Sequence, residues 1–159
     1  MDYLNPPFPT NIPYLYVPMS HTQIVPLDRY NWELCLDIKL SEAQADFIPS
    51  VLYSLAQAKF EDLAPYGIFH HGKIAGFLMY GEFAGICWIN RIMIDIDFQG
   101  QGIGSAALQQ LIAQLKRKMS CREIRTSYSV ENIAADRFFR AHGFVPSEAV
   151  TGEIVARLG

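Results

Sequence analysis

The chain has 159 residues, of which half are apolar and 18% are charged, and its formal net charge is −3. This composition is typical of one compact globular domain and excludes a disordered chain. The small negative charge offers no basic surface for nucleic acid or an anionic membrane, and no apolar run approaches the ~20 residues of a membrane-spanning helix.

The first part of the chain predicts an arm, a strand, two helices and a pair of strands. Residues 1–20 contain five prolines, which predicts an irregular arm ahead of a domain over residues 21–159. We expect a short strand over 22–27, a helix from 27 or 28 to 38, and a second helix capped by Ser41 and kinked or divided at Pro49. Two strands follow over 66–71 and 74–81, joined by a tight turn at residues 71–73.

The second part predicts a central strand, a long helix and a closing group of short elements. The strand over 85–96 is apolar on both faces, and its pattern is interrupted at Asn90 and Arg91, where we expect a bulge or a splay. A strand over 122–130, a helix over 132–143 and strands over 144–150 and 152–158 end the chain. The long helix has one apolar face, formed by Leu108, Leu111, Ile112, Leu115 and Met119. This order predicts a mixed α/β fold.

The stretch "DFQGQGIGS", residues 97–105, lies between the central strand and the long helix. It is either a turn that needs the conformational freedom of glycine or a backbone cradle for an anion. A helix N-terminus offers free N–H groups to a phosphate, and Gly100, Gly102 and Gly104 carry no β-carbon to obstruct one. A P-loop would need a lysine after the last glycine, and a dinucleotide fingerprint would need that glycine one residue later. ATP, GTP and NAD are therefore not the expected ligands.

The cysteines and histidines indicate neither disulfides nor a metal site. The three cysteines lie far apart without a CxxC pair, which predicts free thiols in a reducing cytoplasm. His70 and His71 are adjacent and have no spaced cysteines or carboxylates near them, so we expect no metal.

Two motifs resemble those of the GNAT superfamily of N-acetyltransferases. "QGQGIG" at residues 99–104 matches its (Gln/Arg)-x-x-Gly-x-(Gly/Ala) signature, and "NIAADRFFRAHGF" fits its Asn-x-x-Ala…Gly-Phe pattern. The resemblance spans about residues 22–157 and implies a mostly antiparallel, splayed sheet flanked by helices, with acetyl-CoA as the acetyl donor. Segments 31–60, 91–104 and 151–158 resemble the bacterial spermine/spermidine (diamine) acetyltransferases. A small polyamine or diamine is therefore the expected acceptor.

The resemblance implies which residues bind acetyl-CoA. The backbone of Ile92, Met93 and Ile94 is expected to pair with the pantetheine arm, and an N–H there would polarise the thioester carbonyl. Asn132 is expected to hold the far side of the cofactor, cap the following helix, or do both. The pyrophosphate contacts are expected from Gln99, Gly100, Gln101, Gly102, Gly104 and Ser105.

Direct attack of an amine on the thioester involves two proton transfers. A base takes a proton from the ammonium of the acceptor, and an acid can protonate the leaving thiolate. Many relatives use a tyrosine as the acid, but Phe139 occupies that position here and cannot donate a proton. Tyr128 is the substitute candidate, unless it only packs on the sheet or the thiolate leaves unassisted. Asp95 is the first candidate for the base, directly or through water, although it could be a solvated strand-end carboxylate. The other candidates for the base are Glu33, Glu82 and Glu153.

The acceptor site is expected to be acidic. Glu33 and Glu153 could pair with the distal ammonium of a polyamine, and Trp32 could provide a cation–π wall. Exposed charges and a core tryptophan are the alternatives at these positions. Two other functions stay open: transfer to another amine such as a protein N-terminus, and a non-catalytic acyl-CoA-binding regulatory domain. A homodimer is a further expectation, because dimers are common among relatives.

Overall fold

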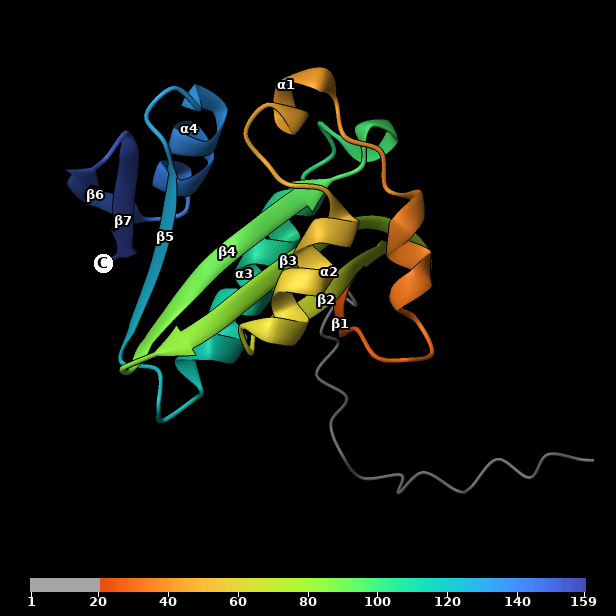
Figure 1. Ribbon diagram of the computed structural model, residues 1–159, viewed down its shortest axis with the longest axis horizontal. Helices are drawn as coiled ribbons and strands as arrows, with labels where there is room; N and C mark the ends of the chain where they lie inside the picture. The colour runs from red at the N-terminus through yellow and green to blue at the C-terminus, as the bar shows by residue number, and fades with distance from the viewer. Residues whose placement is uncertain (1–20) are drawn as a thin grey trace, which may run out of the picture.

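The computed structural model describes residues 21–159, so the arm expected over residues 1–20 lies outside the described part of the chain. The described residues form one seven-stranded sheet in the order β1-β2-β3-β4-β5-β7-β6, in which only β4 and β5 pair in parallel (Figure 1). The strands are β1 (Thr22–Pro26), β2 (Ala64–His70), β3 (Lys73–Phe83), β4 (Ile86–Ile94), β5 (Glu123–Ser129), β6 (Phe144–Val150) and β7 (Glu153–Leu158). The predicted mixed α/β fold with a mostly antiparallel sheet is confirmed.

Helices cover both faces of this sheet and create two core clusters. Side chains alternate along β3, so Leu78 and Tyr80 join the cluster on the α3 and α4 face, while Phe77 and Met79 join the cluster under η1 and α2. The helical elements are η1 (Trp32–Asp37), α1 (Glu42–Ala45), α2 (Val51–Phe60), η2 (Ile96–Phe98), α3 (Ile103–Lys116) and α4 (Ile133–Ala141). None of the helices within residues 21–159 has the length and hydropathy needed to cross a bilayer.

The first helical segment is shorter and tighter than predicted. The side chain of Asp28 accepts a hydrogen bond from the Tyr30 N–H, and the side chain of Asn31 accepts one from the Asp28 N–H, both at 2.8 Å. These local bonds form a turn in place of a helical start, so only the 3₁₀ helix η1 follows. The predicted cap at Ser41 is confirmed, because its hydroxyl accepts from the Gln44 N–H.

The predicted apolar face of α3 is correct except at its end. Leu108, Leu111 and Leu115 are fully buried, whereas Met119 is fully exposed. The helix ends at Lys116, so Met119 lies in the loop beyond it. The prediction that Met119 belongs to the apolar face of the helix is therefore wrong.

β4 and β5 pair at one end only and then separate. Their parallel pairing ends at Ile89 and Thr126, after which the two strands diverge (Figure 1). In β4, Arg91 pairs with Met79 and Ile89 with Tyr80, so Asn90 is an extra residue and the predicted bulge is confirmed. The bulge turns β4 away from β5 and opens a space between them.

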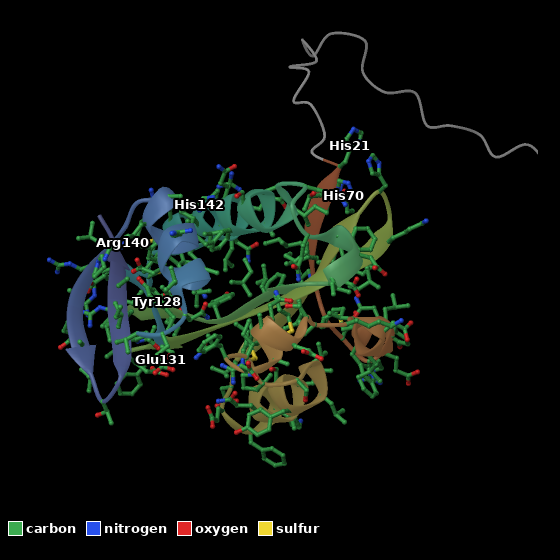
Figure 2. All side chains as sticks on the ribbon, turned by 90° about the horizontal axis from the view of Figure 1, so that it is seen from above. His21, His70, Tyr128, Glu131, Arg140 and His142 are labelled. Carbon is green, nitrogen blue, oxygen red and sulfur yellow. The ribbon has the colours of Figure 1, made fainter. Side chains whose placement is uncertain are left out.

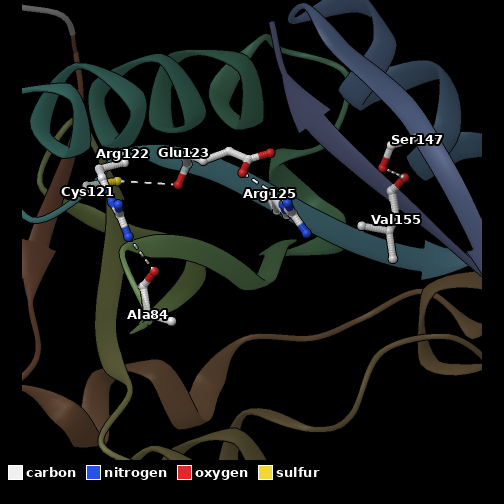
Figure 3. A network of polar contacts seen from close by, with 7 residues as sticks. All are labelled: Ala84, Cys121, Arg122, Glu123, Arg125, Ser147 and Val155. Atoms are coloured by element: carbon white, nitrogen blue, oxygen red, sulfur yellow. Dashed lines mark hydrogen bonds and ion pairs between the residues drawn. The ribbon is translucent and has the colours of Figure 1, made fainter.

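A group of polar contacts fixes the paired end of these strands (Figure 3). The Arg122 guanidinium donates to the carbonyl of Ala84 at 3.2 Å, and the Arg122 N–H donates to the carbonyl of Gly85 at 2.8 Å. Next to them, Arg125 and Glu123 form an ion pair at 2.9 Å. The turn between β3 and β4 is thereby tied to the start of β5, and the separation is confined to the other end.

Candidate functional site

A cleft of about 610 Å³ opens where β4 and β5 separate, and we call it the β4/β5 cleft. Its floor comes from residues 88–92 of β4 and 126–129 of β5. One wall is formed by α1 and the segment leading to α2, and the other by α4 and the loop before it. The N-terminal turn of α3 reaches it at Gly104.

The edge of β4 that faces the cleft carries free backbone groups. The Asp95 N–H donates to the carbonyl of Ala75 on β3, which makes Leu78–Ile92 and Gly76–Ile94 the non-hydrogen-bonded pairs of this ladder. The N–H groups of Ile92 and Ile94 therefore point away from β3, toward the cleft, and no strand within residues 21–159 pairs with them. The Met93 N–H points to β3, and its side chain is buried under η1 and α2.

The glycine stretch forms an open surface at the start of α3. Gly102 is the N-cap residue with φ +77°, and Gly100 has φ +75°, a conformation that favours glycine. A β-carbon added to either would meet nothing within 4 Å, so both leave space over the free N–H groups of the helix. Gly104 differs, because its β-carbon would lie 3.5 Å from Ile94 and 3.6 Å from Phe138. A β-carbon there would make ordinary van der Waals contacts, so Gly104 faces packed side chains and not open space.

The polar side chains of this stretch hold the loop. Gln99 Nε2 donates to Gln44 Oε1 at 2.6 Å and to the carbonyl of Ile94 at 3.0 Å, which joins α1 to the end of β4. Gln101 Nε2 reaches the carbonyl of Asp97 at 3.5 Å. Ser105 lies half-buried in the first turn of α3. Contacts of these three residues with a pyrophosphate stay predictions.

Asp95, the predicted base, is buried at the end of β4 and does not line the cleft. Its Oδ1 accepts from the Asp97 N–H and its Oδ2 from the Lys39 N–H, both at 2.8 Å. The carboxylate thus caps η2 and ties the loop after η1 to β4. This geometry favours a structural role, and the role of base stays a prediction.

The substitution Asp95→Asn separates these two roles. Loss of one charge-assisted acceptor is expected to lower the free energy of unfolding by about 2 kcal/mol. It should reduce kcat less than ~10-fold at temperatures where the protein is folded, whereas loss of a general base would cost ~10²-fold or more. Thermal unfolding and kcat measured on the same preparation decide between them. A ~10²-fold loss without destabilisation would identify Asp95 as the base.

Tyr128 lies on the floor of the cleft and is stacked on Phe139. Its hydroxyl donates to Asp136 Oδ1 at 2.8 Å, and burial, with the adjacent carboxylate, raises the pKa of Tyr128 to about 12. The Tyr128 and Phe139 rings are nearly parallel with centroids 5.7 Å apart. Phe139 is itself buried against Phe138 and Phe144. The structure thus brings Tyr128 next to Phe139, the position at which the family resemblance implied a tyrosine.

The remaining predicted site residues divide into two groups. Asn132 and Glu153 line the β4/β5 cleft, and Asn132 Oδ1 also caps α4 by accepting from the Ala135 N–H. Trp32 instead lines a second hollow with residues of α2, and Glu33 lies exposed on η1. Neither Trp32 nor Glu33 lines the β4/β5 cleft, so the structure does not bring them together with Glu153.

Two charged residues that line the cleft were not predicted from the sequence. Arg91 donates to Gln57 Oε1 and to the carbonyl of Asn90, each at 2.8 Å, and burial lowers the pKa of its guanidinium. Because Arg91 interrupts an otherwise apolar strand, its position in the sequence could have indicated a functional residue. Glu131, in the loop after β5, also lines the cleft.

Within residues 21–159, no group of three or more His, Cys, Asp or Glu side chains is arranged to hold a metal.

The cleft thus combines a splayed parallel strand pair, a free strand edge and a glycine-lined helix N-terminus. Residues 30–144 match the acetyltransferase (GNAT) family, and the chain belongs to this family. It is an N-acetyltransferase that uses acetyl-CoA.

Relatives and solved structures agree with this assignment. The chain is 34% identical over 118 residues to the spermine/spermidine N(1)-acetyltransferase of Bacillus subtilis strain 168, covering 69% of this chain and 78% of the relative. Its fold matches the ribosomal-protein-S18-alanine N-acetyltransferase of Escherichia coli, with TM-score 0.67, 21% identity and coverage of 86% and 92%. It also matches the PaiA N-acetyltransferase of Thermoplasma acidophilum in complex with coenzyme A, with TM-score 0.66, 15% identity and coverage of 86% and 98%.

Proposed function

We propose that this enzyme acetylates a primary amine of a small polyamine or diamine such as spermidine or spermine. The 34% identity to a spermine/spermidine acetyltransferase over most of both chains carries the proposal. Two carboxylates in the cleft support it: Glu131 from the loop after β5 and Glu153 at the start of β7. A polyamine has several ammonium groups, so one can react while carboxylates bind another.

We further propose that acetyl-CoA lies along the free edge of β4. The N–H groups of Ile92 and Ile94 would bind the pantetheine arm and the thioester carbonyl, and Gly100, Gly102 and the N-terminus of α3 would bind the pyrophosphate. Asn132 on the opposite wall would contact the same molecule. When bound, acetyl-CoA supplies the activated acetyl group that the amine attacks.

A second acceptor class is favoured by one observation, the Arg91 guanidinium in the cleft. A cation there disfavours a polyamine locally and suits an acceptor that carries a carboxylate or carbonyl beside its amine, such as a protein N-terminus. Glu153 would bind a polyamine, whereas Arg91 would bind an acceptor that carries a carboxylate or carbonyl beside its amine.

The acceptor is tested by coenzyme A thiol release with spermidine, spermine, lysine and an alanine-terminated peptide. We expect the polyamines to have the highest kcat/KM. Glu153→Gln should raise the KM for spermidine about 3- to 10-fold with little change in kcat, because one partly exposed ion pair is lost. Glu148→Gln, on exposed β6, is the matched control. Preference for the peptide would replace the polyamine proposal with the second class.

A cytoplasmic location and a homodimer belong to the same proposal. Cys35, Cys87 and Cys121 are free thiols, which is typical of a reducing compartment. The dimer stays a prediction that light scattering can check.

A further inference from the structure

A chain of polar contacts runs from the floor of the β4/β5 cleft to the surface through Tyr128, Asp136 and Arg140. Figure 2 labels Tyr128 and Arg140, the two ends of this chain. The Tyr128 hydroxyl donates to Asp136 Oδ1 at 2.8 Å, and Arg140 Nε donates to both oxygens of Asp136 at 3.0 and 2.9 Å. Tyr128 is 6% exposed, whereas the side chains of Asp136 and Arg140 are 28% and 55% exposed. The contacts therefore connect a buried hydroxyl to a carboxylate that water can reach.

The direction of the bond between Tyr128 and Asp136 is fixed by charge. The hydrogen bonds from Tyr128 and then from Arg140 lower the pKa of Asp136, so its carboxyl group is ionised. An ionised carboxylate only accepts, which means that the O–H of Tyr128 points at Asp136. A phenolic oxygen that donates its proton keeps a lone pair with which it can accept a hydrogen bond.

The ring of Tyr128 is also held in place. It stacks on Phe139, whose own ring contacts Phe138 and Phe144 edge-on at 5.3 Å between centroids. With the ring and the hydroxyl both fixed, Tyr128 is oriented before an acceptor arrives.

We propose that Asp136, held by Arg140, is a positioning residue that turns the O–H of Tyr128 away from the cleft, so that Tyr128 accepts the proton of the attacking amine and Asp136 passes a proton to water. The proposal rests on N-acetyl transfer to an amine and not on which amine is used. It gives Tyr128 a role opposite to that of the general acid expected from the sequence.

The proton balance is as follows. The neutral form of the amine reacts after its ammonium has lost one proton to water. Its nitrogen forms a bond to the thioester carbon while the carbonyl π pair moves to the oxygen, and the nitrogen becomes positively charged, which makes its N–H strongly acidic. That N–H bond breaks as its proton moves to the Tyr128 oxygen, while the original Tyr128 proton moves to Asp136 Oδ1. Asp136 then releases a proton to water and is ionised again. The carbonyl double bond then re-forms as the carbon–sulfur bond breaks, and the sulfur takes the electron pair of that bond as a thiolate.

The raised pKa of Tyr128 is consistent with this direction. At about 12 it is well above the ~8.5 of an ordinary thiol, so transfer of the Tyr128 proton to the thiolate is uphill. A thiolate of this pKa can leave without an acid. Tyr128 is thus better suited to relay a proton than to supply one.

A double-mutant cycle tests whether Asp136 acts through Tyr128. Tyr128→Phe keeps the stacked ring and should lower kcat ~10²-fold, the size of an acid–base contribution, with the KM for acetyl-CoA changed less than ~3-fold. Asp136→Asn should lower kcat ~10-fold or more in the wild type and less than ~2-fold in the Tyr128→Phe background. Arg137→Gln, on the exposed side of α4, is the matched control and should leave kcat unchanged. Equal losses from Asp136→Asn in both backgrounds would overturn the proposal.

A second measurement needs no acceptor and separates this proposal from the identity of the substrate. The ¹³Cζ signal of Tyr128, assigned by its absence in Tyr128→Phe, reports on the hydroxyl bond. We expect Asp136→Asn to shift it and Arg137→Gln to leave it in place. An unchanged signal in Asp136→Asn would contradict the bond whatever amine the enzyme uses, whereas a shifted signal with no polyamine turnover would count only against the polyamine.

Discussion

Substitution of Gly102 by glutamate should remove measurable binding of coenzyme A. Gly102 has φ +77° and lies at the N-terminus of α3, where an added side chain would enter open space over the free helix N–H groups. A glutamate there places a negative charge where the pyrophosphate is expected. Its repulsion and bulk should raise the Kd at least ~100-fold, or about 2.7 kcal/mol.

A matched control separates the backbone strain of this substitution from its effect on coenzyme A binding. Gly72, in the turn between β2 and β3, has φ +75° and nothing within 4 Å of an added β-carbon, but it does not precede a helix. Gly72→Glu should therefore destabilise the fold by a similar amount, about 1–3 kcal/mol, while calorimetry shows an unchanged Kd. Equal affinity in the two variants would rule out Gly102 as part of the binding surface.

Ile92→Pro should lower kcat by ~10²- to 10³-fold. The Ile92 N–H points away from β3, so proline at this position removes no bond of the β3–β4 ladder. It does remove one of the two donors that face the cleft. Loss of one donor to a developing oxyanion costs this much, about 3 kcal/mol, in enzymes where such a donor has been removed.

Ile92→Val is the matched control because it keeps the N–H and nearly the whole side chain. Its kcat should stay within ~3-fold of the wild type, since a partly exposed methylene group contributes little to packing. Thermal unfolding of both variants checks that the sheet is intact. If the folded proline variant turned over as fast as the valine variant, the Ile92 N–H would have no part in the reaction.

The sequence predicted the elements whose local signals were strong. Alternation and turn residues located β2, β3 and the turn at His71 and Gly72, where both residues have positive φ. The interruption at Asn90 predicted the bulge, and the bulge lies where β4 and β5 stop pairing and the cleft opens. The start of the first helix was predicted wrongly. There the side chains of Asp28 and Asn31 accept hydrogen bonds from nearby backbone N–H groups and form a turn where a helix was expected.

The site was less predictable, because its contacts join segments far apart in the chain. Asp95 was chosen for its place at a strand end, but its two backbone partners come from residues 39 and 97 and bury it. Trp32 was placed near the acceptor because it adjoins Glu33, whereas the structure places it at a second hollow with residues of α2. The partners of Tyr128 depend on how α4 packs against β5. No local pattern encodes that packing.

Amide hydrogen exchange across β4 tests most directly whether acetyl-CoA lies along its free edge. In the free protein, the Met93 amide should exchange slowly because it faces β3, while the Ile92 and Ile94 amides should exchange fast. Saturating coenzyme A should slow Ile92 and Ile94 at least ~10-fold and leave Met93 nearly unchanged. Tight binding of coenzyme A that left the exchange of Ile92 and Ile94 unaltered would contradict this account of the site.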